Sequence, residues 1–120
     1  MKSRIISSST LTGQTVYNLN DENIGEIKDL MIDPHNEEVV YAVLAFGGFL
    51  GMGSKYFAIP LRALQFSEAD NNIRLDVNKE TLENAPSFDK DNWPLTADNE
   101  FIDSVYSHYG YEGQRRAAYK

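Results

Sequence analysis

Short hydrophobic runs separated by turn residues occupy most of the chain up to residue 77. The run 39–46 (VVYAVLAF) is almost entirely apolar and rich in β-branched and aromatic residues, so it predicts a strand covered on both faces. Further β-prone runs lie at residues 15–17, 26–33, 56–59, 64–66 and 73–77. About six short strands joined by Asn, Asp, Gly and Pro turns predict a mainly β fold, a small barrel or sandwich.

The pattern changes after residue 77, where the apolar positions take helical spacing. Asn78 is suited to cap a short helix through Leu82, which Pro86 ends because the residue before a proline avoids the α region. Asp98 is suited to cap a longer helix that ends at Gly110. The apolar stripe of that helix would consist of Phe101, Ile102, Val105, Tyr106 and Tyr109.

Aromatic residues in this C-terminal part indicate that it packs against another surface. The residues concerned are Phe88, Trp93, Phe101 and Tyr106. Burying an aromatic side chain is worth roughly 1.5–3 kcal/mol relative to leaving it in water. We therefore expect this segment to pack on the β domain or on a neighbouring chain, with Trp93 in a structural role.

Acidic residues outnumber basic ones, 18 to 11, which gives the 120-residue chain a formal charge of −7. This charge argues against nucleic acid as a partner, because phosphates are repelled, and against an anionic membrane surface. The absence of cysteine excludes disulfides and thiolate chemistry and fits a reducing compartment, so we expect a cytoplasmic protein. No apolar run approaches the ~20 residues of a transmembrane segment.

Motifs for catalysis or ligand binding are incomplete. Residues 48–55 (GFLGMGSK) come close to a phosphate-binding loop, but Ser and Lys are in the reverse order and a strand follows where a helix is needed. The oxygen-rich stretch 18–23 lacks the Gly and Glu that a calcium-binding loop requires, so a solvated turn is favoured. His35 and His108 have no metal-ligand spacing, and the pair Glu37–Glu38 is expected to be solvated turn charge. We therefore expect no catalytic residue, no metal and no cofactor.

Asp29 is harder to explain as surface charge. It lies between Ile27 and Met31 on one face of a predicted strand, and a carboxylate on an apolar face is costly unless it is hydrogen-bonded. We favour a structural role, as acceptor for backbone N–H groups of a neighbouring turn, and leave a functional acid open. Arg62, which follows the strand end expected at Pro60, is its most plausible charged neighbour.

The glycine-rich loop 47–54 carries three bulky apolar residues, Phe49, Leu50 and Met52, that a small barrel cannot readily cover. Exposed apolar clusters often mark contact surfaces, and a symmetric dimer is the commonest closed assembly. We therefore expect a homodimer, or a site for a larger protein partner, centred on Phe49 and Leu50 with Tyr56 alongside. The alternative is that Phe49 folds back and closes the mouth of its own barrel.

Taken together, these residues resemble the PRC-barrel family, which is named for the cytoplasmic domain of the photosynthetic reaction-centre H subunit and also occurs in a ribosome-maturation factor. The resemblance covers about residues 11–77 in order. The later stretches 82–88 and 91–94 look like the C-terminal extension of free-standing bacterial members. The matching residues are Gly13-x-x-Val16-Tyr17, Gly25-Glu26-Ile27-x-Asp29, Ile32-Asp33, Val39-Val40-Tyr41-Ala42-Val43, Gly47-Gly48-Phe49-Leu50-Gly51, and Phe57-Ala58-Ile59-Pro60-Leu61 before Leu64.

The resemblance implies a small, strongly bent β-barrel. It divides the chain into an N-terminal tail (1–10), a PRC-barrel domain (11–77), a helical extension (78–112) and a basic tail (113–120). It implies no catalytic residues, because the family has no established common activity, and free-standing members suggest a stress-related role. The positions that it marks as structural are Gly25, Asp29, Gly47, Gly48, Gly51 and Pro60.

We therefore expect a non-enzymatic protein-interaction or assembly module that self-associates. Two alternatives stay open. The first is a small-ligand-binding protein or enzyme that uses Asp29 or the polar turn at 18–23. The second is an adaptor associated with the ribosome or RNA processing, for which the basic residues Arg115, Arg116 and Lys120 are the only support in the sequence.

Overall fold

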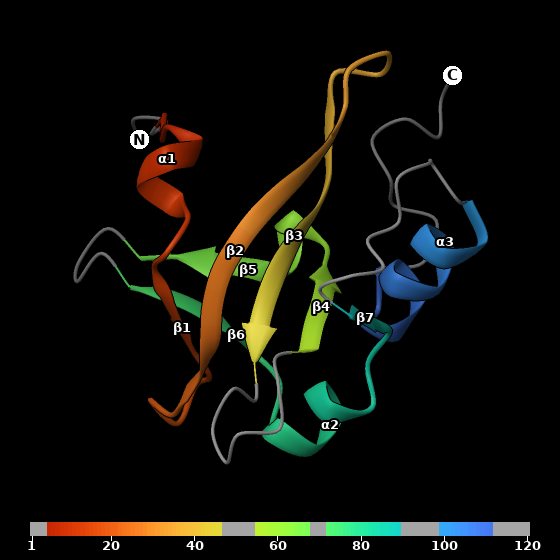
Figure 1. The fold of residues 1–120 in the computed structure, drawn as a ribbon. Coiled ribbons are helices and arrows are strands. Elements are labelled where there is room, and N and C mark those ends of the chain that lie inside the picture. Colours follow the sequence, from red (N-terminus) through yellow and green to blue (C-terminus); the bar gives the residue numbers. More distant parts are fainter. Residues whose placement is uncertain (1–4, 47–54, 68–71, 90–98, 112–120) are drawn as a thin grey trace.

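The computed structural model describes residues 5–46, 55–67, 72–89 and 99–111 and has a mainly β fold (Figure 1). The strands form one sheet of seven, in the order β5-β6-β1-β2-β3-β4-β7. Neighbouring strands are antiparallel, except that β1 and β6 run parallel. The elements of the described residues are α1 (Ser8–Leu11), β1 (Thr15–Tyr17), β2 (Asn23–Asp33), β3 (Glu38–Phe46), β4 (Lys55–Ile59), the 3₁₀ helix η2 (Leu61–Ala63), β5 (Leu64–Phe66), β6 (Ile73–Leu75), α2 (Lys79–Glu83), β7 (Ser87–Asp89) and α3 (Asn99–His108).

All six β-prone runs of the sequence form strands, so the predicted fold class is confirmed. The sheet also contains β7, which lies in the stretch expected to be a helical extension. Phe88 of β7 pairs with Tyr56 of β4, and the two rings pack edge to face with their centroids 6.0 Å apart. Cross-strand aromatic pairs stabilise sheet edges, which explains why this short segment extends along β4.

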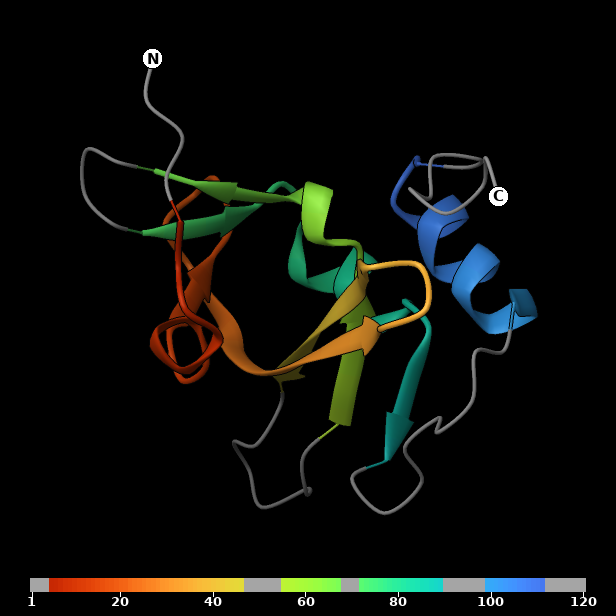
Figure 2. The ribbon, with the colours of Figure 1, turned by 90° about the horizontal axis from the view of Figure 1, so that it is seen from above.

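Extra residues in the long strands bend the sheet into a curled half-barrel. The pairing of β2 with β3 passes over Lys28 on β2 and Val40 on β3, and the pairing of β1 with β2 passes over Ile24. Each unmatched residue makes a β-bulge, which bends its strand and increases the twist. In Figure 2, seen from above, the sheet curls until β5 and β6 face β3 and β4 across the interior.

Gly25 allows β2 to pass close to β3. Its φ is +133°, a conformation that L side chains rarely adopt. A Cβ at this position would also run into the backbone carbonyl oxygen of Ala45 on β3. Any side chain here would therefore strain the backbone of β2 and push β3 away.

Two hydrophobic clusters lie on opposite faces of β3, as its nearly continuous apolar run predicts. Ala42, Leu44 and Phe46 point into the half-barrel, where they pack with residues from eight other elements, among them β1, β5 and α2. Tyr41 and Val43 belong to a second cluster on the outer face. The prediction of a strand covered on both sides is confirmed.

The helix α3 covers this outer face with its apolar stripe (Figure 2). Ile102, Val105 and Tyr106 are buried there with residues of β3 and β4. The hydroxyl of Tyr106 donates a hydrogen bond of 2.6 Å to the backbone carbonyl of Val40, the bulged residue of β3. The helix is thus attached to the sheet by apolar contact and by one buried hydrogen bond.

Element ends agree with the capping residues in the sequence. The side-chain oxygen of Asn78 accepts the Thr81 N–H at 2.7 Å and caps α2. Gly110, with a φ of +84°, follows α3 in the left-handed conformation common after a helix. The strand β4 ends immediately before the buried Pro60. Asp98, the expected cap of α3, lies outside the described residues.

Candidate functional site

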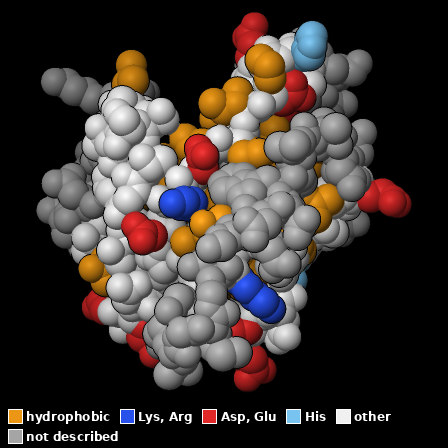
Figure 3. Space-filling view, viewed as in Figure 1, with side chains coloured by type: hydrophobic (Ala, Val, Ile, Leu, Met, Phe, Trp, Pro, Cys, Tyr) orange, Lys and Arg blue, Asp and Glu red, His pale blue; other side chains and the backbone are white. Residues whose placement is uncertain are grey.

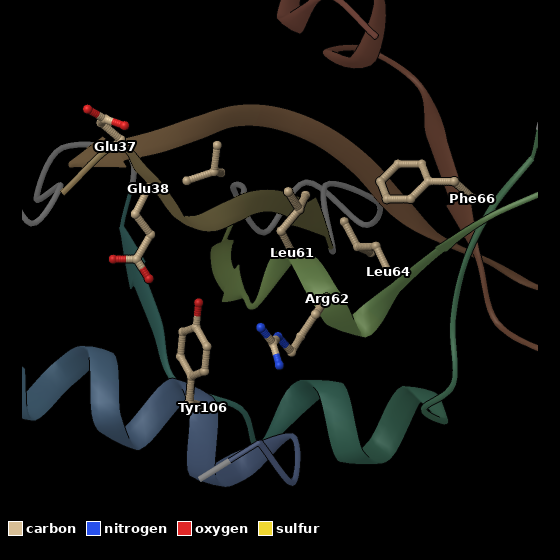
Figure 4. A pocket seen from close by; sticks show the side chains of 8 residues that line it. Glu37, Glu38, Leu61, Arg62, Leu64, Phe66 and Tyr106 are labelled. Carbon is tan, nitrogen blue, oxygen red and sulfur yellow. The ribbon is translucent and has the colours of Figure 1, made fainter. Parts of the chain in front are cut away.

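An open pocket of about 590 Å³ lies between the start of β3, η2, β5 and α3 (Figure 4). This volume is typical of small-molecule sites. Leu61, Leu64 and Phe66 supply an apolar wall, and Glu38, Arg62 and Tyr106 bring polar groups together at the other end. The described residues that line the pocket are Glu37, Glu38, Val39, Leu61, Arg62, Leu64, Phe66 and Tyr106.

Glu38 corrects the expectation that the Glu37–Glu38 pair is solvated charge. Glu37 is exposed, but Glu38 opens β3 and is only 4% exposed. Burying a carboxylate is costly unless charged or polar groups compensate for the lost water. Tyr106, which is buried, and Arg62, which is exposed, line the same pocket, so its polar end combines a carboxylate, a guanidinium and a phenol. Because the Tyr106 hydroxyl donates its hydrogen bond to the Val40 carbonyl, the phenol oxygen can act toward a pocket occupant only as a hydrogen-bond acceptor.

The β2–β3 hairpin extends as a two-stranded ribbon beyond the rest of the sheet (Figure 1). Within the described residues, β1 pairs with β2 only up to Glu26, and β4 pairs with β3 only from Ala42 onward. Ile32 on this ribbon is 62% exposed. We call the side of residues 28–33 that faces away from β3 the outer β2 edge.

Asp29 lies on the outer β2 edge and is exposed, which corrects the expectation that it shares the apolar face of Ile27. The bulge residue Lys28 lies between them and shifts the alternation by one, so Ile27 is buried whereas Lys28 and Asp29 are exposed. The Asp29 Oδ1 accepts the backbone N–H of Leu30 at 2.8 Å. Asp29 is therefore a backbone acceptor for its own strand, while Arg62 lies at the pocket on η2.

The polar turn at 18–23 is a closed hydrogen-bonded unit. Asn18 is 1% exposed, and its Oδ1 accepts the N–H groups of Asn20 at 2.9 Å and Glu22 at 3.0 Å. Its Nδ2 donates to the Glu22 carboxylate at 2.7 Å. Asp21 has a φ of +63° and forms an ion pair with Arg74 at 3.0 Å. These oxygens hold the turn and its neighbouring strand together, which favours a structural turn over a ligand site.

Tyr41, which is buried beneath α3, and Tyr109, which is half-buried directly after α3, have hydroxyl groups that burial affects. Burial raises the pKa of Tyr41 to about 12 and raises the pKa of Tyr109 above its usual value. Tyr41 packs edge to face on Phe101, with ring centroids 6.0 Å apart. The Tyr109 hydroxyl is buried and meets no hydrogen-bond partner among the described residues.

Most of the residues expected to form an interaction surface lie outside the described residues. The expected interaction residues outside the described part of the chain are Phe49, Leu50 and Met52. The expected structural residues Gly47, Gly48, Gly51 and Trp93 also lie outside it. Tyr56 is described, and it is only 7% exposed in the outer cluster. Its ring packs against Phe88, so little of it is accessible to a partner.

The two histidines lie apart from any cluster of metal ligands in the structure. His35 is exposed in the turn between β2 and β3, and Nε2 of His108 lies 3.2 Å from the carbonyl oxygen of Thr81. Across the described ranges, no group of three or more His, Asp or Glu side chains is placed to hold a metal ion. No helix in these ranges is long and apolar enough to span a bilayer.

Comparison with known proteins identifies the fold. The family model of the PRC-barrel domain matches residues 4–82, about two thirds of the chain. The protein belongs to the PRC-barrel family. The match begins before the expected boundary at residue 11 and includes α1, whose Leu11 is buried in the inner cluster of the PRC barrel. Among curated proteins, no sequence matches this chain significantly.

Sequence reasoning missed the pocket of the PRC barrel, because its walls come from four separate elements. Glu38 carries no local signal of burial, since it follows a turn and a second glutamate. Arg62 stands out in the sequence only as a possible neighbour of Asp29.

Proposed function

We propose that this PRC-barrel protein is a non-enzymatic interaction or assembly module that pairs with a second copy through the loop 47–54. The observation that carries this proposal is the packing next to the loop. Phe46, the last residue of β3, is buried at 8% exposure and packs against Phe57, with ring centroids 6.1 Å apart. Because Phe46 and Phe57 both place their rings in the inner cluster beside the loop, we infer that Phe49 is not needed there as a plug. That favours a contact role for Phe49, Leu50 and Met52.

The charge of the chain is compatible with such a contact. A formal charge of −7 opposes association only where carboxylates face each other. The loop 47–54 (GGFLGMGS) contains no charged residue, so an apolar contact there can keep the acidic groups at its rim. An isologous contact of this kind uses the same loop on both copies.

The test is a double substitution, Phe49→Ser with Leu50→Ser, measured by light scattering across concentration. The proposal expects the variant to lose the dimer while its circular dichroism stays that of the wild type. Leu19→Ser is the matched control, because Leu19 is an exposed leucine in a different turn and should leave the mass unchanged. A double variant that stays dimeric would move the contact elsewhere, and one that unfolds would support the plug.

The proposal extends to a cytoplasmic location and a contribution to stress tolerance, both of which rest on the resemblance to free-standing family members. A deletion strain that survives heat, acid and osmotic shock as well as its parent would remove the stress role. That result would leave the assembly role intact, because the two are measured independently.

The pocket favours a second candidate function, the binding of a small amphiphile. Its apolar wall fits a hydrocarbon or aromatic body, and the described lining residues include two carboxylates, Glu37 and Glu38, and one guanidinium, Arg62, which favours a cationic head group. Phenethylamine and 3-phenylpropionate share a similar body and carry opposite charges. Only the amine should raise the melting temperature, since a ligand selective for the native state stabilises it.

A Glu38→Gln variant separates a specific pocket effect from a general salt effect. It should abolish the stabilisation by phenethylamine, while Glu26→Gln, an exposed residue on β2, should preserve it. Equal shifts with both probes, or none with either, would exclude the amphiphile site and leave the interaction module as the function.

A further inference from the structure

Among the described residues no strand pairs with the outer β2 edge, and the helix α1 lies beside β2. The last contact of β2 with the β1 side is at Ile27, whose N–H donates to the carbonyl of Gln14 at 2.9 Å and whose carbonyl accepts from Gly13 at 2.7 Å. Beyond Ile27, the described residues place no strand against the outer β2 edge. An open edge presents backbone N–H and C=O groups to any extended segment that approaches it.

Apolar side chains make this edge suited to self-pairing. Ile32 is largely exposed, and Leu30, two residues earlier on the same strand face, is partly buried against the inner cluster. In Figure 3, hydrophobic side chains lie exposed between acidic ones on the projecting end of the ribbon. Long exposed strand edges with apolar residues are sites of edge-to-edge association unless something blocks them.

The Asp29 carboxylate already accepts a hydrogen bond from a backbone N–H group that an added strand would need. β2 carries no extra residue between Asp29 and Asp33, so its backbone groups alternate in direction and the N–H groups of Leu30 and Ile32 lie on one side. The Leu30 N–H already donates to the Asp29 carboxylate at 2.8 Å. A second strand must displace this charge-assisted hydrogen bond before it can pair.

The negative charge of Asp29 also opposes the pairing of two β2 edges. If two β2 edges pair antiparallel about a two-fold axis with Leu30 opposite Ile32 of the second copy, then Asp29 lies opposite Asp33 of the second copy. Like charges directly opposite each other destabilise a strand pair. Asp33 keeps its charge readily, because the hydrogen bond from the Asn36 side chain lowers the pKa of its carboxyl group.

We propose that the outer β2 edge is a self-pairing surface that Asp29 keeps closed, so that removing its carboxylate lets two copies of the chain join edge to edge. The loop 47–54 follows the other end of β3, so this surface does not depend on whether that loop forms the dimer. Asp29 thus prevents the ribbon edges of two copies from pairing.

The experiment compares Asp29→Ala with Lys28→Ala, its exposed neighbour on the same edge, by light scattering. Both changes are placed in the wild-type chain and in the Phe49→Ser, Leu50→Ser background, where loop pairing is removed. In that background the Asp29→Ala variant should show twice the mass of the Lys28→Ala control. Adding Ile32→Lys to Asp29→Ala should restore the control mass, because a charge then replaces the apolar contact.

Hydrogen exchange identifies the edge that pairs. In the Asp29→Ala variant, the Leu30 amide should exchange faster than in the Lys28→Ala control at low concentration, because it loses the Asp29 acceptor. As concentration rises, the amides of both Leu30 and Ile32 should exchange more slowly. Equal masses for the two variants, with no concentration dependence at these amides, would overturn the proposal. Association with protection at another segment would overturn it as well. If the serine background does not fold, the same comparison in the wild-type chain decides between these outcomes.

Discussion

The hydrogen bond between the Tyr106 hydroxyl and the Val40 carbonyl leads to a sharp test of how α3 is held on the barrel. The bond is 2.6 Å long and buried, and it satisfies a carbonyl that the bulge at Val40 turns away from β2. Tyr106→Phe removes the hydroxyl and leaves the carbonyl without this partner. Because an unsatisfied buried polar group costs about 1–3 kcal/mol, we expect a loss of that size in the free energy of unfolding.

The chain supplies a matched control beside the same helix. Tyr109, the residue directly after α3, is half-buried, and its buried hydroxyl meets no partner among the described residues. Removing a buried hydroxyl that makes no hydrogen bond is neutral or stabilising. Tyr109→Phe should therefore change the free energy of unfolding by less than about 0.5 kcal/mol, or raise it.

Urea unfolding and thermal unfolding, both followed by circular dichroism, measure the stability of the two variants. The Tyr106→Phe variant should lose roughly 4–12 °C in melting temperature, with an unchanged urea m-value because the surface exposed on unfolding is the same. A stable Tyr106→Phe variant beside a destabilised Tyr109→Phe variant would refute the reasoning. That outcome would mean that α3 is held by other contacts than those described.

Three further predictions concern the barrel itself. Gly25→Ala should lower the free energy of unfolding in urea by at least about 1–3 kcal/mol, since it adds backbone strain and a collision with the Ala45 carbonyl. An unchanged urea midpoint would contradict the close approach of β2 to β3 at Gly25. Asn18→Ala should cost about 2 kcal/mol, because it removes the buried side-chain oxygen that accepts from the backbone N–H groups of Asn20 and Glu22. Asn20→Ala, at an exposed position of the same turn, should be neutral, and equal effects of the two substitutions would contradict this account. The raised pKa of Tyr41 means that the folded protein favours the neutral phenol over the phenolate. The contribution of the neutral phenol to the free energy of unfolding is therefore complete below pH ~10 and is lost as the pH rises through about 12. A Tyr41→Phe variant whose melting temperature falls with alkaline pH in the same way as the wild type would reject this explanation.

The elements that follow from local pattern were predictable from the sequence. The run 39–46 is covered on both faces as its composition predicts, because a strand that separates two clusters needs apolar residues at every position. Asn78 and Gly110 carry their end signals in single residues. The family resemblance was confirmed by the match over residues 4–82.

The wrong face predicted for Asp29 has a single physical origin: one residue inserted in a strand reverses every later side chain. Lys28 is such a residue, and it moves Asp29 from the expected apolar face to the solvent. A bulge depends on how two strands pair, so no local pattern in β2 reveals it. β7 escaped prediction for a similar reason, since three residues extend there only because β4 offers an edge and Tyr56 a ring.

The pocket was out of reach of sequence reasoning because its polar end depends on tertiary contacts. Glu38, Arg62 and Tyr106 are separated by long stretches of chain and converge only when α3 packs on the sheet. Their individual residue types are common on surfaces, so none of them stands out alone.

The central claim is that this PRC-barrel protein works by pairing with a second copy through an uncharged apolar loop. Light scattering on the unmodified chain at high micromolar concentration tests it most directly. We predict a mass twice that of the 13.6 kDa chain, insensitive to added salt because the contact is apolar. A mass of one chain at that concentration would contradict the claim.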